Sequence, residues 1–67
     1  MFYNVSTRLE QLRKKHNFTQ EKLAFLVGVS RQTIYKWEAA ICLPNYKNIF
    51  KLLKIYNVEF LDLFIKL

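Results

Sequence analysis

This chain of 67 residues has one cysteine, one glycine, one proline and one histidine. The lone Cys42 excludes a disulfide within the chain, and Cys42 with His16 falls short of the four ligands of a structural zinc site. No hydrophobic run is long enough to span a membrane, and the N-terminus lacks the residue order of a signal peptide. Because an unpaired cysteine fits a reducing compartment, we expect a cytoplasmic protein with no metal, no cofactor and no membrane partner.

Acidic residues are also scarce. Five acidic residues stand against 11 basic ones, for a net charge of +6. Residues 1–36 hold seven basic and two acidic residues, a net +5, whereas residues 37–67 hold four and three, a net +1. A basic half is the expected footprint of a polyanion binder, but many small domains are basic for solubility. Charge alone leaves both interpretations open.

Hydrophobic residues are plentiful at 52%, with 16% aromatic. A domain this short buries only about 60% of its unfolded surface, so it needs a dense helical core, dimerisation or both. The apolar spacing is helical throughout, and no stretch alternates with the period of a strand. We predict one all-α domain over residues 1–67, with five helices at about 7–16, 20–27, 31–39, 45–56 and 59–66.

Short polar residues mark the helix boundaries. Thr7 with Glu10 is typical of a capping box that begins the first helix. Thr19 and Ser30 are expected to cap the second and third helices, and Gly28 supplies a turn between them that can take positive φ. The side chains expected to face the core from the last three helices are Ile34, Trp37, Tyr46, Ile49, Leu52, Leu53, Tyr56, Phe60, Leu63 and Phe64.

The stretch TQEKLAFLVGVSRQTIYKWE, residues 19–38, carries the main functional signal. It predicts two short helices joined by a tight turn, with the second helix held to the core through Ile34 and Trp37. The outward side chains Arg31, Gln32, Tyr35 and Lys36 can all donate hydrogen bonds. In the DNA major groove, Arg pairs with guanine and Gln with adenine, each good pair giving about 1–3 kcal/mol of discrimination.

The segments LRKKHNFTQEKLA, VGVSRQTIYKWE, Pro44 and IYNVEFLDLF, in this order and spacing, resemble the lambda-repressor/Cro-like helix-turn-helix regulators, also called the XRE family. The resemblance covers about residues 8–64. It implies a compact five-helix lambda-repressor-like domain that binds double-stranded DNA. The DNA-reading positions it implies are Ser30, Arg31, Gln32, Tyr35 and Lys36. The phosphate-contacting positions it implies are Gln20, Asn45, Tyr46 and Lys47. It also implies a structural ion pair between Arg13 and Glu38.

The chain departs from the family pattern just past the third helix. Ala40 stands where members usually have glycine, and a left-handed conformation is strained for alanine. We therefore expect this helix to end differently, up to a turn later. Ile41, Cys42 and Leu43 replace positions that are often basic, which adds an apolar patch.

The chain has more apolar residues than are needed for the core stripes, which are the rows of apolar side chains on the core-facing side of each predicted helix. Leu61 and Ile65 lie one helical turn apart, off the core stripe of the last helix, and Ile55 lies off that of the fourth. With Ile41 and Leu43 they predict a two-fold homodimer built by the C-terminal third. The alternative is that these residues only thicken the core.

These features predict a sequence-specific transcriptional regulator, most simply a repressor, that reads a pseudo-palindromic operator as a homodimer. It would be of bacterial or phage type and associated with the nucleoid when bound. An enzyme is not expected, because the sequence offers no nucleophile–base pair, metal cluster or glycine-rich phosphate loop. No second domain is evident to bind a small-molecule ligand. The rival interpretation is an antitoxin or another protein-interaction module, with a toxin or similar protein as partner and DNA binding secondary.

Overall fold

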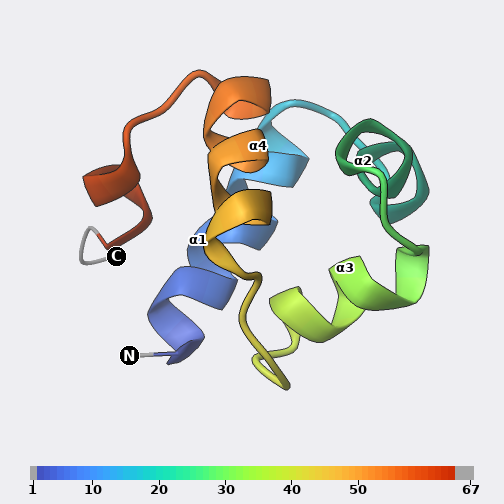
Figure 1. Cartoon of the computed structure of the whole chain (residues 1–67), viewed down its shortest axis with the longest axis horizontal. Coiled ribbons are helices and arrows are strands. Elements are labelled where there is room, and N and C mark those ends of the chain that lie inside the picture. The colour runs from blue at the N-terminus through green and yellow to red at the C-terminus, as the bar shows by residue number, and fades with distance from the viewer. Residues whose placement is uncertain (1, 65–67) are drawn as a thin grey trace.

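Four α-helices and one short 3-10 helix make up the part of the chain that the structure describes. The computed structural model describes the backbone of residues 2–64 and the side chains of residues 5–63. The helices are α1 (Phe2–Lys15), α2 (Gln20–Val27), α3 (Arg31–Glu38) and α4 (Tyr46–Tyr56), followed by the 3-10 helix η1 (Phe60–Phe64). Figure 1 shows α1 and α4 at the centre, α2 and α3 on one side and η1 on the other. The all-α class is confirmed, and over the described residues the fifth predicted helix is the shorter 3-10 helix η1 instead of an α-helix.

Helix α1 begins earlier than its sequence indicated. It starts at Phe2, so Thr7 lies inside the helix and the predicted capping box does not form. The extension has a physical reason: Val5 continues the apolar face of Leu9 and Leu12, and all three side chains are buried. The helix ends before Asn17, which takes the left-handed conformation at φ 60°.

Helices α2 and α3 form as their capping residues predict. Thr19 Oγ1 accepts a hydrogen bond from the Lys22 backbone N–H at 3.0 Å, and Ser30 Oγ accepts one from Thr33 at 3.1 Å. Each cap satisfies a backbone donor that has no partner within its own helix. The bounds of α2 match the prediction, and α3 ends one residue earlier than predicted.

The end of α3 contradicts the expectation drawn from Ala40. This residue does take the left-handed conformation, at φ 61°, and the helix stops at Glu38 without an extra turn. The Ile41 N–H donates to the Lys36 carbonyl at 2.9 Å, and the Ala40 N–H donates to the Trp37 carbonyl at 3.3 Å. These bonds satisfy carbonyls at the helix end, which offsets a left-handed cost of about 1–2 kcal/mol for a residue with a Cβ.

Helix α4 is capped by Asn45, whose Oδ1 accepts from the Asn48 N–H at 2.9 Å, and Asn57 ends it at φ 55°. Two expectations about its faces are wrong. Tyr46 is 75% exposed instead of facing the core, because it lies in the first turn and stacks edge-to-face on Phe50 at 6.0 Å. Ile55 is not off the core stripe but packs against the core cluster.

The short helix η1 replaces the first part of the predicted fifth helix. The Asp62 carboxylate accepts from the Glu59 N–H at 2.9 Å, and the Asp62 N–H donates to the Glu59 carbonyl at 2.9 Å, which closes a tight i to i+3 turn. Leu63 is fully buried, whereas Phe60, expected to face inward, is nearly half exposed. The side chain of Phe64 lies outside the described residues.

The core is a single cluster to which all five elements contribute. Its buried hydrophobic side chains are Val5, Leu9, Leu12, Leu23, Ala24, Val27, Ile34, Trp37, Leu52, Tyr56 and Leu63. Helix α3 packs against both α1 and α2, and η1 packs against α1 and α4. As a result, the α2–turn–α3 unit has its inner side fixed by α1 and α4 and its outer side open.

Candidate nucleic-acid interface

The turn between α2 and α3 sets the angle between the two helices. Gly28 is at φ 90°, and its N–H donates to the Ala24 carbonyl at 2.8 Å. The Val29 N–H bonds to the same carbonyl at 3.0 Å. The Lys51 ammonium, from α4, donates to the Val27 carbonyl at 3.1 Å. The end of α2 is therefore closed by backbone bonds and by a cation, which is favourable at a helix C-terminus.

Helix α3 has one buried and one exposed face. Ile34 and Trp37 are buried, so they fix the helix against α1 and α2. The side chains of Arg31, Gln32, Tyr35 and Lys36, all predicted to read DNA, are exposed. Ser30 is exposed as well, but its hydroxyl caps the helix and lies 2.9 Å from Thr33 Oγ1. Four of the five predicted reading side chains therefore share an open helix face.

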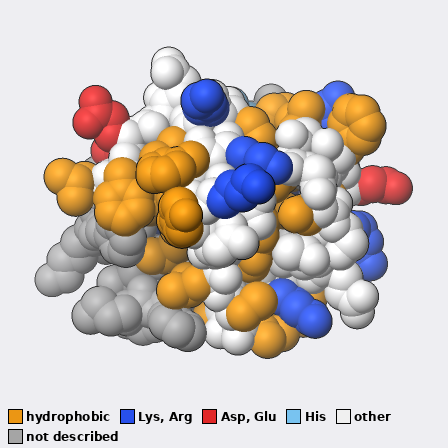
Figure 2. Space-filling model, in the orientation of Figure 1, with side chains coloured by type: hydrophobic (Ala, Val, Ile, Leu, Met, Phe, Trp, Pro, Cys, Tyr) orange, Lys and Arg blue, Asp and Glu red, His pale blue; other side chains and the backbone are white. Residues whose placement is uncertain are grey.

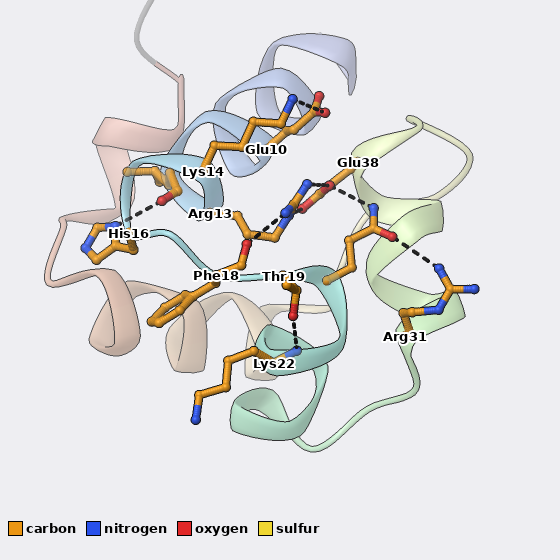
Figure 3. Close-up of polar contacts among 11 residues, drawn as sticks. Glu10, Arg13, Lys14, His16, Phe18, Thr19, Lys22, Arg31 and Glu38 are labelled. Carbon is orange, nitrogen blue, oxygen red and sulfur yellow. Dashed lines mark hydrogen bonds and ion pairs between the residues drawn. The ribbon is translucent and has the colours of Figure 1, made fainter.

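A continuous polar network joins α1, α2 and α3 behind this face (Figure 3). The Arg13 guanidinium donates to both oxygens of Glu38, at 2.7 Å from Nε and 3.1 Å from Nη2, and to the Phe18 carbonyl at 2.9 Å. Gln20 Nε2 donates to Glu38 Oε1 at 3.1 Å. Arg31 Nη1 donates to Gln20 Oε1 at 3.4 Å. The structure thus brings Arg13 and Glu38 together, and it links them to two residues predicted to contact DNA.

Burial shapes the electrostatics of this network. The hydrogen bond to Glu38 raises the pKa of Arg13, although partial desolvation opposes the shift. Behind the pair, burial raises the pKa of the Tyr56 hydroxyl, and the charge of Glu38 raises it further while Arg13 opposes. The Tyr56 ring also packs against His16 in a tilted arrangement, with ring centroids 4.9 Å apart. The Arg13 guanidinium therefore stays charged beside Glu38, and the Tyr56 hydroxyl stays neutral at neutral pH.

The predicted phosphate contacts lie at two helix N-termini. Gln20 is the first residue of α2 and is half-buried, with its carboxamide held by Glu38. At the start of α4, Asn45 uses its side-chain oxygen as the helix cap, while Tyr46 and Lys47 are exposed. Unpaired N–H groups at helix N-termini suit phosphate oxygens.

A family model described as helix-turn-helix matches residues 9–63. The chain belongs to this helix-turn-helix family. It is also similar to an HTH-type transcriptional regulator of Archaeoglobus fulgidus, 41% identical over 91% of this chain and 86% of that protein. An HTH-type transcriptional regulator of Methanocaldococcus jannaschii is 43% identical over 91% of this chain and 92% of that protein. The resemblance to XRE-like regulators is therefore confirmed.

One further relative differs in length. This helix-turn-helix chain is 41% identical to the HTH-type transcriptional activator BcrR of Enterococcus faecalis over 76% of its own residues, but it spans only 25% of that protein. No solved structure gives a significant match.

The residues predicted to form a dimer interface are placed unevenly in this helix-turn-helix protein. Leu61 is 74% exposed, and Ile41 and Leu43 are exposed in the connection after α3. Ile55 is partly buried against the core, and Ile65 lies outside the described residues. Figure 2 shows apolar side chains gathered over α4 and η1 on one face, with basic side chains beside them.

Three features of α2 and α4 were not predicted from the sequence. Phe25 on α2 is 79% exposed and Phe50 on α4 is more than half exposed, and neither was assigned a surface role. The bond from Lys51 to Val27 was also missed, because it depends on the packing of α4 on α2. Within the described residues, no three His, Cys, Asp or Glu side chains gather as metal ligands would, and no helix has the length and hydropathy to cross a membrane.

Proposed function

We propose that this protein is a sequence-specific regulator that binds double-stranded DNA through α3 in the major groove. The observation that carries the proposal is the open face of α3. Arg31, Gln32 and Lys36 point away from a helix whose other face is buried through Ile34 and Trp37. A rigid helix with outward donors suits base edges, which specify sequence through bidentate hydrogen bonds.

The phosphate contacts would fix the register of α3. Gln20 and the start of α4, with Asn45, Tyr46 and Lys47, flank the reading helix in the proposed complex. The net charge of +6 supports attraction to the backbone and release of counterions on binding. Ser30 would contribute mainly as the cap of α3, and Tyr35 would contact a thymine methyl or a phosphate.

We further propose that the protein acts as a homodimer on a pseudo-palindrome and represses transcription by occlusion. The exposed Leu61, Ile41 and Leu43 support pairing of the C-terminal third. A two-fold dimer would place its two α3 helices one turn of DNA apart, so half-sites about 10 bp apart are expected. Occlusion needs no activity beyond stable binding, which supports repression. The activator named among the relatives is a much longer protein.

Selection of bound DNA from a random pool, repeated over a range of salt, tests the proposal. The expected result is a palindromic consensus, and Gln32→Ala should relax the preference at one base pair per half-site by about 1–3 kcal/mol. Gln11→Ala, an exposed glutamine on α1, is the matched control and should leave the consensus unchanged. A steep salt dependence without any consensus would leave a basic, non-specific binder.

A second candidate function is a protein-interaction module, such as an antitoxin, with DNA binding secondary. The observation that favours it is the exposure of Phe25, Tyr46 and Phe50, large apolar side chains outside the proposed dimer surface. Capture of one stoichiometric protein partner by the wild-type protein but not by Phe25→Lys or Phe50→Lys would support it.

A further inference from the structure

Glu38 is the point where the polar network of α1, α2 and α3 converges. Its Oε2 accepts from Arg13 Nε at 2.7 Å, and its Oε1 accepts from both Arg13 Nη2 and Gln20 Nε2 at 3.1 Å. The Glu38 side chain is only 5% exposed. In such a site, hydrogen bonds to a charged acceptor are strong and the groups that make them are well ordered.

The carboxylate decides which way the Gln20 carboxamide faces. The amide nitrogen donates to Glu38, since the opposite orientation would point the Gln20 oxygen at a negative charge. The amide oxygen therefore faces α3, where it accepts from Arg31 Nη1 at 3.4 Å. Figure 3 shows this line of contacts, from Arg13 through Glu38 to Arg31.

Apart from the contact with Gln20, few interactions restrict the side chain of Arg31. It is the first residue of α3, its side chain is exposed, and its bond to Gln20 is the one hydrogen bond recorded for its guanidinium within the described part of the chain. A free arginine in water samples many rotamers, and fixing one on binding costs about 0.5–1.5 kcal/mol. A weak contact that already points the side chain outward reduces that cost.

We propose that Glu38 is a positioning residue for base recognition. It orients Gln20, which in turn holds Arg31 in the direction that reading a base requires, so a side chain that does not touch DNA contributes to preference at one base pair. This inference rests on the proposed function. It goes beyond a structural ion pair, because that role would require only Arg13 and Glu38.

The test measures binding to operator variants at every position for the wild type, Arg31→Ala, Gln20→Met and Glu38→Gln. Arg31→Ala identifies the base pair that Arg31 reads. At that base pair, Gln20→Met and Glu38→Gln should each lower the preference about three- to ten-fold, the size expected from losing the order of one long side chain. In the Arg31→Ala background neither should lower it further.

Two comparisons separate positioning from a general loss of binding. Preference at the base pair lost in Gln32→Ala should stay unchanged in both variants, whereas a missing phosphate contact would weaken all sequences equally. Glu10→Gln is the matched control, because it removes a carboxylate from an exposed pair with Lys14 on α1. It should leave every preference as in the wild type.

A second measurement needs no DNA. NMR relaxation of the Arg31 Nε–H group in the free protein should show a more mobile side chain in Gln20→Met and Glu38→Gln than in the wild type. If Glu38→Gln fails to fold, Gln20→Met carries the test, because it leaves the Arg13–Glu38 pair in place.

Unchanged Arg31 mobility, or unchanged preference at its base pair in folded Gln20→Met, would overturn the inference. A wild-type protein with no base preference would overturn the proposed function instead. The two failures are therefore distinguishable, since the relaxation measurement still reports on the contact itself.

Discussion

Arg13 and Glu38 form the most buried ion pair of the described residues, with side chains 12% and 5% exposed and a shortest N–O distance of 2.7 Å. Lys14 and Glu10, on the same helix, form an exposed pair at 3.2 Å. Burial separates the two in energetic terms. Removing one partner of a buried pair leaves an uncompensated charge, whereas an exposed helical pair is screened by water.

Arg13→Met should therefore lower the free energy of unfolding by about 3–5 kcal/mol. Lys14→Met, the adjacent control, should change it by about 0.3–0.5 kcal/mol. Urea denaturation followed by circular dichroism measures both. Equal losses in the two variants would mean that Glu38 is as well solvated without Arg13 as Glu10 is without Lys14.

Tyr56 has a buried hydroxyl with no hydrogen-bond partner among the described residues. Leaving a polar group buried and unpaired costs free energy, and an apolar group of the same shape avoids that cost. Tyr56→Phe should keep the free energy of unfolding at pH 7 within about 1 kcal/mol of the wild type, or raise it. A larger loss would show that the hydroxyl has a partner in solution.

The same residue gives a pH dependence. Burial raises the pKa of Tyr56 in the folded state above its ordinary value of 10.0. The neutral form is therefore favoured by folding, and this contribution is full below pH 10 and is lost as the pH rises above it. Wild-type stability should fall more steeply above pH 10 than that of Tyr56→Phe. Tyr46→Phe, at an exposed tyrosine, should keep the wild-type slope.

At the scale of the element, the end of α3 shows how tertiary hydrogen bonds override local preference. Ala40 takes φ 61° although a residue with a Cβ is disfavoured there, and the next segment turns back through the Ile41–Lys36 bond. The preceding Ala39 is at φ −87°, an ordinary value for alanine. The two adjacent alanines thus differ in backbone conformation but not in side chain.

Ala40→Gly should raise the free energy of unfolding by about 1 kcal/mol, because glycine removes the left-handed strain. Ala39→Gly should lower it, since glycine there only adds entropy to the unfolded chain. Thermal unfolding of both variants gives the sign directly. A loss of stability in Ala40→Gly would mean that the left-handed conformation is not kept in solution.

At the scale of the whole molecule, the exposed apolar surface bears on assembly. Leu61 on η1 belongs to the proposed dimer surface, whereas Phe25 on α2 does not, and the two are similarly exposed at 74% and 79%. A stable dimer usually buries about 1,200–2,000 Å² in total, so a charge placed within it is costly. Substitution of Leu61 and, separately, of Phe25 therefore gives a matched test of where the dimer surface lies.

Sedimentation equilibrium at micromolar concentration should give a dimer mass for the wild type and for Phe25→Lys, and a monomer mass for Leu61→Lys. The lysine at position 61 would have to be desolvated at the interface, whereas at position 25 it would stay in water. A monomeric wild type would contradict the dimer proposal. A monomeric Phe25→Lys would indicate that the dimer interface lies on α2 instead.

The sequence by itself determined the all-α class, the bounds of α2, the caps at Thr19 and Ser30, and the outward face of α3. These depend on local chemistry: hydrogen bonds over three or four residues and an apolar period that matches the helix. The pairing of Arg13 with Glu38 was available from family resemblance, although 25 residues separate the two along the chain.

Only the tertiary structure decided the features that join distant segments. The early start of α1, the left-handed Ala40, the outward Tyr46 and the reduction of the fifth helix to η1 all follow from which surfaces pack and which carbonyls find donors. The hydrogen bonds from Glu38 through Gln20 to Arg31 join α2 to both ends of α3. They cannot be predicted from the spacing of residues along the sequence. Such contacts depend on the angle between helices, which is set by the packing of the whole core.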